Sequence, residues 1–291
     1  AQISLNFNNY NKTTLHEVFD KACELAQVRG IRVTGSELVG LVPMDALLMA
    51  GGYYLKKQRY TMGIPKNDII EVAIQSLGLN DIVPFKPKEK IIEFAVKKYS
   101  KELMSLKTHN FIEELSSNSP APGGGSVSAL AGSLGAALVS MVGALNHEKK
   151  ENINIKLELE KIGIESQEIK DRLSFLVDED TNAFNGLIEA NRLPSNDEVE
   201  KKEKLNAIKQ ANEYSIEIPL DVIYHCSRVI ELSEKLIDNG NNSLVSDAGV
   251  SAEVALAGVR GAAMNVFINL LNIRDDNYCS EKRKLVQKLI S

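Results

Sequence analysis

Ser119-Pro-Ala-Pro-Gly-Gly-Gly-Ser126 is followed by nineteen residues without a charge, Val127 to Leu145. The two prolines end whatever element precedes them, because proline lacks an N–H group and its ring restricts φ. The glycines let backbone N–H groups approach a ligand closely, and Ser126 stands where a helix would begin. The stretch therefore predicts a ligand-binding or anion-binding helix start, although an ordinary proline–glycine linker has the same composition.

Two common nucleotide-binding motifs do not fit this stretch. A Walker loop ends in Gly-Lys-Ser/Thr, which places a lysine on the phosphates, and that ending is missing here. A dinucleotide fingerprint follows an apolar strand, whereas the residues before the glycines, Phe111 to Ser117, have the pattern of a helix. The glycines therefore indicate a different kind of ligand site.

The uncharged run is nearly long enough to cross a bilayer, but it consists mainly of Ala, Gly and Ser. Small residues at every third or fourth position are typical of a buried helix, because they let the backbones of neighbouring helices approach closely. We therefore expect this helix to lie at the centre of a domain, and we expect no membrane partner.

Composition limits the classes of function. A chain of 291 residues with 44% hydrophobic and 25% charged residues is typical of a globular protein and favours two domains. The net charge of −5 argues against a nucleic-acid partner, because binding phosphates requires a basic face. The most basic segment, Lys201-Lys-Glu-Lys204, is interrupted by an acid.

The three cysteines are far apart and form no CxxC motif, which fits a reduced, cytoplasmic setting. The four histidines lack the spacing of helical metal ligands, so we expect no metal. The N-terminus has neither the pattern of a secretory signal nor an initiator methionine. This last observation suggests a chain that begins inside a longer protein.

Residues 1–100 have a mixed pattern. Apolar and polar side chains alternate in residues 2–8, and residues 31–34 have the pattern of another short strand. Helical periodicity covers Leu15 to Arg29 and Met44 to Lys57. This order predicts an α+β domain, a truncated ferredoxin-like segment whose missing partner would lie upstream.

The helical periodicity of residues 109–291 predicts an all-α domain, which is a bundle of long helices. Helices of this length usually bury a second apolar face against another subunit, so we expect a homodimer or a higher homo-oligomer. The segments with helical periodicity are 111–117, 126–147, 151–191, 197–238, 245–273 and 280–290.

Polar residues in apolar helical surroundings are candidates for chemistry. In the segment from Asp178 to Phe184, Asp178 and Asn182 share one face, and Asp180 lies about 200° away around the helix. The plain alternative is an exposed acidic face. Apolar neighbours such as Phe175 would raise the pKa of a carboxyl group and make it a usable acid or base.

Two further clusters follow. Asp238-Asn-Gly-Asn-Asn-Ser leads to Asp247 at a helix start, where Asp247 would either cap the helix or act in a site. Asn265 and Asn269 are four residues apart on an apolar helix, and unpaired amides there would cost about 1–3 kcal/mol each. Their partners would be backbone groups at a dimer seam or the polar edge of a heterocycle.

Taken together, these motifs resemble the cyclodeaminase/cyclohydrolase family of folate enzymes. The first matching segment is the glycine-rich stretch that begins at Ala121. The others are Leu176-Val-Asp-Glu-Asp-Thr-Asn-Ala-Phe, Asn191-Arg-Leu-Pro and Ser246-Asp-Ala-Gly-Val. The first hundred residues resemble the end of glutamate formimidoyltransferase in Gly35-Ser-Glu-Leu-Val-Gly-Leu-Val-Pro and in Leu77-Gly-Leu-Asn-Asp. The catalytic histidine of that family precedes the matched part, so we expect no transferase activity from residues 1–291 alone.

The resemblance implies a reaction within histidine degradation and one-carbon metabolism. A formimidoyl-tetrahydrofolate substrate would close its own ring and release ammonia, and acidic residues would move the protons. The expected catalytic residues are Asp180, Asp178 and Asp247, without an order among them. The expected substrate-binding residues are Gly123, Gly124, Gly125, Ser126, Arg192, Asn241, Asn242, Asn265 and Asn269.

Two alternatives stay open at this point. A methenyltetrahydrofolate cyclohydrolase would use the same all-α frame, with water in place of the departing amine. A non-catalytic helical module that only holds an oligomer together would need none of the aspartates.

Overall fold

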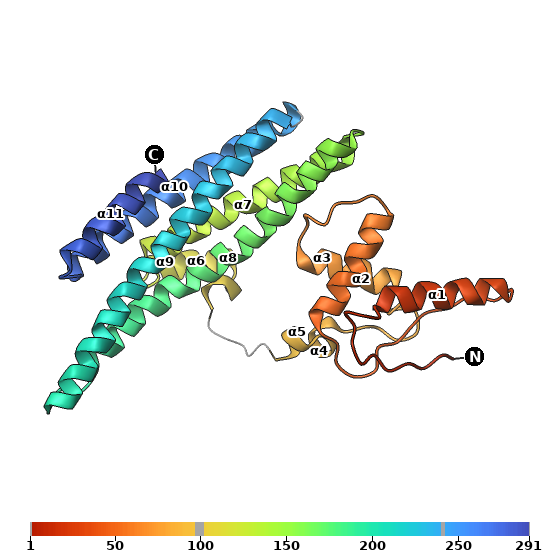
Figure 1. Ribbon diagram of the computed structural model, residues 1–291, viewed down its shortest axis with the longest axis horizontal. Coiled ribbons are helices and arrows are strands. Elements are labelled where there is room, and N and C mark those ends of the chain that lie inside the picture. The colour runs from red at the N-terminus through yellow and green to blue at the C-terminus, as the bar shows by residue number, and fades with distance from the viewer. Residues whose placement is uncertain (1, 97–101, 240–241, 291) are drawn as a thin grey trace. The chain divides into compact units, whose positions relative to one another are not determined.

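The computed structural model describes residues 2–96, 102–239 and 242–290. The chain divides into two compact units, residues 1–100 and residues 101–291. Figure 1 shows the short helices of unit 1 and the long, side-by-side helices of unit 2. Each unit is described by itself.

Unit 1 is a small helical domain. Helix α2 (Met44–Lys57) packs against α3 (Lys66–Ser76), and their apolar faces enclose the fully buried Leu47 and Ile74. The remaining helices are α1 (Leu15–Val28), α4 (Pro87–Lys90) and α5 (Ile92–Ala95).

Helix α1 begins and ends as its sequence predicts. Thr14 accepts a hydrogen bond from the N–H of Glu17, and the Glu17 carboxylate accepts one from the N–H of Thr14, which is a complete capping box. Gly30 follows the helix with a φ of +70°, a conformation that favours glycine.

The predicted ferredoxin-like α/β segment is wrong. Within the described residues the structure has no strand, and the nearest feature is one isolated parallel bridge between Val42 and Ile91. The alternating residues 2–8 run over the surface, where Ile3 is 69% exposed. A strand is stable only when a neighbouring strand pairs its N–H and C=O groups, and among the described residues neither segment 2–8 nor segment 31–34 has such a neighbour.

Unit 2 is a helical bundle, in agreement with the prediction for its sequence. Short segments at its start are η1 (Leu103–Ser105) and α6 (Thr108–Ser116). The long helices and the segments between and after them are α7 (Gly124–Lys149), α8 (Ile153–Arg192), α9 (Glu198–Asn239), η2 (Asn242–Leu244), α10 (Val245–Asn269), η3 (Leu270–Asn272) and α11 (Asp276–Ile290).

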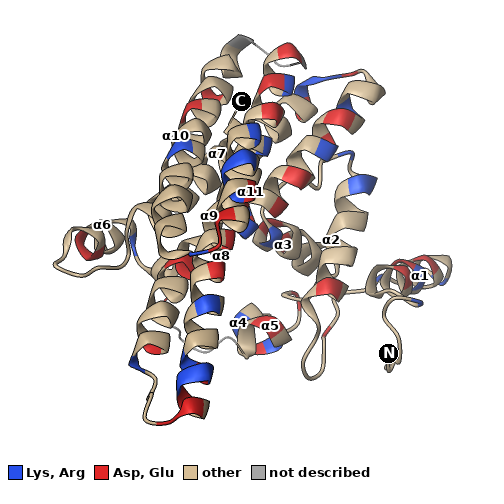
Figure 2. Cartoon of the chain, turned by 60° about the vertical axis from the view of Figure 1, so that its left-hand side comes forward, with Lys and Arg blue, Asp and Glu red and all other residues tan. Residues whose placement is uncertain are grey.

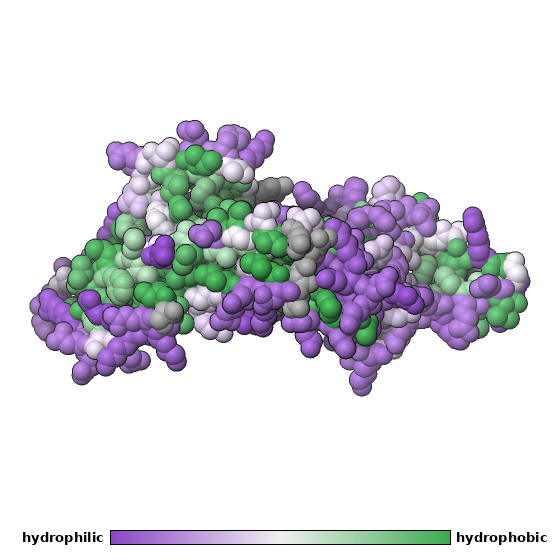
Figure 3. All heavy atoms as spheres, turned by 90° about the horizontal axis from the view of Figure 1, so that it is seen from above, coloured by the Kyte–Doolittle hydropathy of each residue, from purple (hydrophilic) through white to green (hydrophobic). Residues whose placement is uncertain are grey.

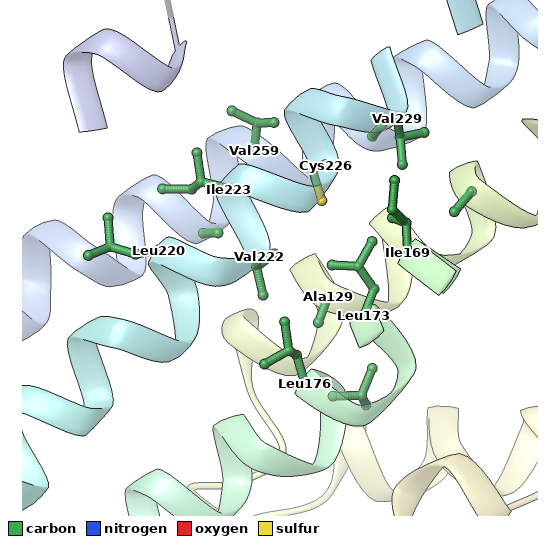
Figure 4. Packing of buried hydrophobic residues seen from close by; sticks show 14 of the residues in the cluster. Ala129, Ile169, Leu173, Leu176, Leu220, Val222, Ile223, Cys226, Val229 and Val259 are labelled. Carbon is green, nitrogen blue, oxygen red and sulfur yellow. The ribbon is translucent and has the colours of Figure 1, made fainter. Parts of the chain in front are cut away.

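Four of these helices form the core. Helix α7 packs against α8 and α10, and α9 packs against the same two helices from the opposite corner. Figure 4 shows Leu173 and Leu176 of α8, Val222 and Cys226 of α9, and Ala129 of α7 within one apolar cluster. Burial of these side chains is the main stabilising term of such a bundle.

The outer side of the α8–α9 seam carries a ladder of polar contacts. Arg228 Nε donates to Glu165 at 2.6 Å, Arg172 Nε donates to Asp221 at 2.8 Å, and the Tyr214 hydroxyl donates to Glu179. Successive partners are seven residues apart on each helix, at 165, 172 and 179 and at 214, 221 and 228. A seven-residue repeat is the spacing at which two long helices keep the same faces together.

The outer side of the α7–α10 seam is apolar instead. Leu134 on α7 is 55% exposed, and Met264 on α10 is 69% exposed. Figure 2 shows few charges on α7 and α10, and Figure 3 shows apolar side chains gathered over the bundle of unit 2. Exposed apolar residues recur here every seven residues, at 127, 134 and 141 on α7 and at 250, 257 and 264 on α10.

Helices α7 and α10 are also long and apolar enough to cross a membrane by length and composition alone. Core helices of soluble bundles pass the same test, and α7 is mostly buried within unit 2. Only 39% of the apolar window of α10 is buried. The exposed part belongs to the apolar surface described above.

Candidate functional site

The glycine-rich stretch begins the central helix, as predicted. Gly123 is the N-cap of α7, and this residue has no side chain to pair with the free N–H groups of the first turn. Asp180 of α8 takes that role, because its Oδ2 accepts a hydrogen bond of 2.8 Å from the N–H of Ser126. One N–H group that the sequence assigns to a ligand is therefore occupied by a carboxylate of the protein.

Ser126 connects the two helices a second time. Its hydroxyl lies 2.9 Å from the carbonyl oxygen of Val177 and 3.1 Å from Asp180 Oδ2, so it is in reach of two acceptors on α8. Ser126 is fully buried, and the Thr181 hydroxyl lies 3.4 Å from it. These contacts hold the Asp180 carboxylate in one orientation.

Gly125 is the position where glycine is required. A Cβ atom at Gly125 would lie 2.0 Å from Asp180 Oδ1, which is far inside van der Waals contact. Only a residue without a side chain lets the carboxylate lie against the first turn of α7.

Asp180 has an unusual environment for a carboxyl group. Burial raises its pKa above the ordinary aspartate value, and the two hydrogen bonds from Ser126 oppose that shift. The positive end of the α7 dipole also faces this carboxylate. A partly buried carboxyl group with a raised pKa is suited to accept a proton and return it.

Asn265 of α10 lies at the same end of α7. Its Nδ2 donates to the Gly261 carbonyl at 2.9 Å and lies 3.7 Å from where a Cβ of Gly124 would be. The structure therefore brings together the start of α7, Asp180 and Asn265.

Asp178 does not face this group. Its Oδ1 accepts a hydrogen bond of 2.5 Å from the N–H of Leu103, which attaches the segment η1 to α8. Burial raises the pKa of Asp178, and backbone hydrogen bonds from Leu103 and Met104 oppose the shift. Asp178 therefore contacts the first segment of unit 2 and does not contact the glycine-rich turn.

Asn269 has a structural partner as well. Its Nδ2 donates to the carbonyl oxygen of Ser215 at 2.7 Å. Pro219 lies four residues after Ser215 inside α9, and proline has no N–H with which to bond that carbonyl. Asn269 therefore satisfies an acceptor that a proline leaves free, a role that Pro219 could have indicated in the sequence.

Two other candidates, Asp247 and Arg192, lie apart from Asp180. Asp247 is in the first turn of α10, and Arg192 is exposed at the last turn of α8, about 18 Å along the helix from Asp180. Asn242 begins η2, but its side chain lies outside the description, and Asn241 lies outside the described residues altogether. Among the described residues there is no group of His, Cys, Asp and Glu side chains arranged to hold a metal ion.

Sequence comparison identifies the family. The profile described as Formiminotransferase-cyclodeaminase matches residues 107–288, which is more than half of the chain. The chain belongs to this family. A second profile, described as Formiminotransferase domain, matches residues 1–97. Both resemblances predicted from the sequence are confirmed.

Relatives match over the full chain or over part of it. The formimidoyltransferase-cyclodeaminase of Gallus gallus is 33% identical over 292 residues, 100% of this chain and 54% of that protein. The methenyltetrahydrofolate cyclohydrolase of Methylorubrum extorquens is 34% identical over 181 residues, 62% of this chain and 87% of that protein. This chain spans about half the length of the formimidoyltransferase-cyclodeaminases that it matches.

One solved structure has the same fold. The formiminotetrahydrofolate cyclodeaminase of Thermotoga maritima superposes with a TM-score of 0.58 at 26% identity, and the match covers 65% of this chain and 90% of that chain.

Proposed function

We propose that unit 2 is a formimidoyltetrahydrofolate cyclodeaminase, which forms methenyltetrahydrofolate and releases ammonia. The observation that carries this proposal is the partly buried Asp180 carboxylate held at the glycine-rich start of α7. The similar structure from Thermotoga maritima is named for the same activity, and the family profile covers both elements.

The reaction needs orientation and proton transfer. A folate N–H nitrogen attacks the amidine carbon, a C–N bond forms, and the C–N bond to the terminal nitrogen breaks. The terminal nitrogen leaves as NH₃ after it gains the proton of the attacking nitrogen and one proton from solvent, and the product is the methenyl cation. Holding both reacting groups of one molecule together supplies several kcal/mol of the acceleration.

Asp180 is the group that we assign to proton transfer. In its ionised form it accepts the proton of the attacking nitrogen, and it then donates that proton to the departing one. A carboxylate held beside the substrate also stabilises the developing cation, because it is already oriented before the reaction.

We assign folate binding to the glycines from Gly123 to Gly125 and to Asn265. Backbone N–H groups at a helix start suit a carboxylate or the polar edge of a pterin. Arg192 remains a candidate for the glutamyl tail of the substrate. Roles in histidine degradation and a cytoplasmic location stay predictions.

A second candidate is a methenyltetrahydrofolate cyclohydrolase. The relative from Methylorubrum extorquens favours it, since 87% of that protein matches 62% of this chain. In that reaction water adds to the methenyl carbon and opens the ring, so a base is again required.

Self-association is part of the proposal. The α8–α9 seam is closed by polar contacts, whereas the opposite seam between α7 and α10 exposes apolar side chains at seven-residue intervals. Contiguous apolar surface of this kind marks a protein interface. We propose that a second copy of the chain covers it.

Purified protein is tested with formimidoyl-tetrahydrofolate while methenyl absorbance and ammonia are recorded together. We expect both to appear in equal amounts, and we expect Asp180→Asn to abolish both. Absence of both products from folded wild-type protein would refute the deaminase. Hydrolysis of methenyl-tetrahydrofolate in the same preparation would then support the second candidate.

A further inference from the structure

Asn212 of α9 carries a buried amide that is not among the site residues predicted from the sequence. The residue is only 7% exposed. Its backbone carbonyl accepts a hydrogen bond of 2.8 Å from the Ser215 hydroxyl, but no described residue forms a hydrogen bond with its side-chain amide. Buried polar side chains are nearly always paired, so an amide of this kind requires an explanation.

The side chain of Asn212 points to the inner side of the bundle. Tyr214, two residues later, belongs to the outer polar ladder and pairs with Glu179. Side chains two residues apart leave a helix about 200° from one another, so Asn212 points away from that ladder. Ile216, one turn after Asn212 on the same face, is fully buried in the core cluster.

Along the bundle, Asn212 lies at the level of Asp180. Because α8 and α9 run in opposite directions and Tyr214 meets Glu179, Asn212 stands level with Thr181. The Thr181 hydroxyl lies 3.4 Å from that of Ser126, so this level contains the contacts around Asp180. The axes of packed helices are about 8–10 Å apart, and a bicyclic ring with a hydrogen bond at each end spans that separation.

Helix α7 ends before it reaches this level on α9. The two helices run in the same direction and stay in step, since a Cβ at Gly132 would meet Cys226 and a Cβ at Gly135 would meet Val229. Asn212 precedes Cys226 by fourteen residues, whereas α7 begins only eight residues before Gly132. Asn212 therefore lies about 9 Å beyond the start of α7. The free N–H groups of the first turn of α7 point in this direction.

The chemistry of a carboxamide limits what it binds. An asparagine side chain offers one acceptor oxygen and two N–H donors side by side. A cyclic lactam presents the matching pair, an N–H next to a C=O, and so forms two parallel hydrogen bonds with it. The pterin ring of a folate has such an edge at N3 and O4.

We propose that Asn212 holds the substrate by the lactam edge of its pterin ring, while Asp180 meets the reacting nitrogens. The amide N–H donates to O4, and the amide oxygen accepts from N3–H. This inference rests on the proposed function and names the part of the substrate that the inner face of α9 recognises. Asn212 is a binding residue, and it moves no proton.

Binding of 5-formyltetrahydrofolate tests the assignment without turnover, because this ligand has no amine to release. Asn212→Leu keeps the branched shape of the side chain and removes the amide. We expect isothermal titration calorimetry to show an affinity about 10–100-fold lower than that of wild type, as for the loss of buried hydrogen bonds. The control Asn206→Leu makes the same change at an exposed position of α9 and should leave the affinity unchanged.

A second variant tests which edge is recognised. Asn212→Asp replaces the amide by an acceptor-only carboxylate, which repels O4 but accepts from an amino group. We expect this variant to lose affinity for 5-formyltetrahydrofolate and to retain it for the same ligand with a 4-amino group in place of the 4-oxo group. Equal losses for both ligands would overturn the lactam assignment.

Stability and kinetics separate this role from a structural one. Asn212→Leu should not lower the midpoint of thermal unfolding, because no hydrogen bond within the protein is lost. With formimidoyl-tetrahydrofolate, it should raise KM and leave kcat nearly unchanged, whereas Asp180→Asn should lower kcat.

Two results would refute the proposal. One is an unchanged affinity of Asn212→Leu for 5-formyltetrahydrofolate, and the other is an equal loss of affinity in Asn206→Leu. A wild-type protein that binds this ligand through Asn212 but releases no ammonia would contradict only the proposed reaction.

Discussion

The side-chain amide of Asn269 on α10 donates a hydrogen bond of 2.7 Å to the carbonyl oxygen of Ser215 on α9. Pro219 occupies the position from which a backbone N–H would normally reach that carbonyl. One polar side chain thus compensates for a proline inside a helix of forty-two residues, and it ties α9 to α10 at the same place.

This relationship predicts a coupling between two positions. Asn269→Ala should lower the free energy of unfolding by about 1–3 kcal/mol, because a carbonyl in the bundle loses its partner. In a Pro219→Ala background the loss should be much smaller, since an alanine at that position would offer its own N–H to the carbonyl of Ser215. Urea unfolding of the four proteins measures the coupling, and strictly additive effects would contradict the assignment.

Gly125→Ala tests the close approach of Asp180. The new Cβ would lie 2.0 Å from Asp180 Oδ1, so the carboxylate must move. We expect kcat/KM to fall about 100-fold, because displacements of about 1 Å have effects of this size. The control is Gly186→Ala on α8, which has nothing within 4 Å of the added Cβ. Equal activity of the two variants would show that Asp180 has no role.

The pKa of Asp180 predicts how stability changes with pH. Burial raises this pKa in the folded state, so the folded protein binds the proton more tightly than the unfolded chain. The resulting stabilisation is fully present below the unfolded aspartate pKa and is lost as the pH rises through the higher folded value. The unfolding free energy of wild type relative to Asp180→Asn should therefore fall between acidic and neutral pH.

Urea unfolding at a series of pH values measures this difference. A difference that does not vary with pH would mean that Asp180 titrates as an ordinary exposed aspartate.

Leu134→Glu tests the apolar seam between α7 and α10. A charge at the centre of this face would be costly to bury against a second copy, so we expect the dimer to dissociate into monomers. Phe175→Glu is the matched control, because Phe175 is 52% exposed on α8 and Leu134 is 55% exposed. Light scattering after size exclusion reports the mass, and a dimer that survives Leu134→Glu would place the interface elsewhere.

Much of unit 2 could be predicted from sequence, because local signals determine helices. The prolines and glycines before Ser126 mark the start of α7, and the apolar periodicity of α8 and α9 continues to their ends. Unit 1 was predicted less well. The alternating residues 2–8 have the pattern of a strand, but a strand also needs a neighbouring strand to pair with, and among the described residues none is present.

The candidate site could also be predicted only in part from the sequence. The sequence by itself determined the family, the helical bundle and the residue types available for proton transfer. Tertiary structure alone distinguished Asp180, which meets Ser126, from Asp178, which meets Leu103. The two carboxyl groups are two residues apart, so they leave the helix in nearly opposite directions, and only the packing of α7 against α8 decides which of them is held at the glycines.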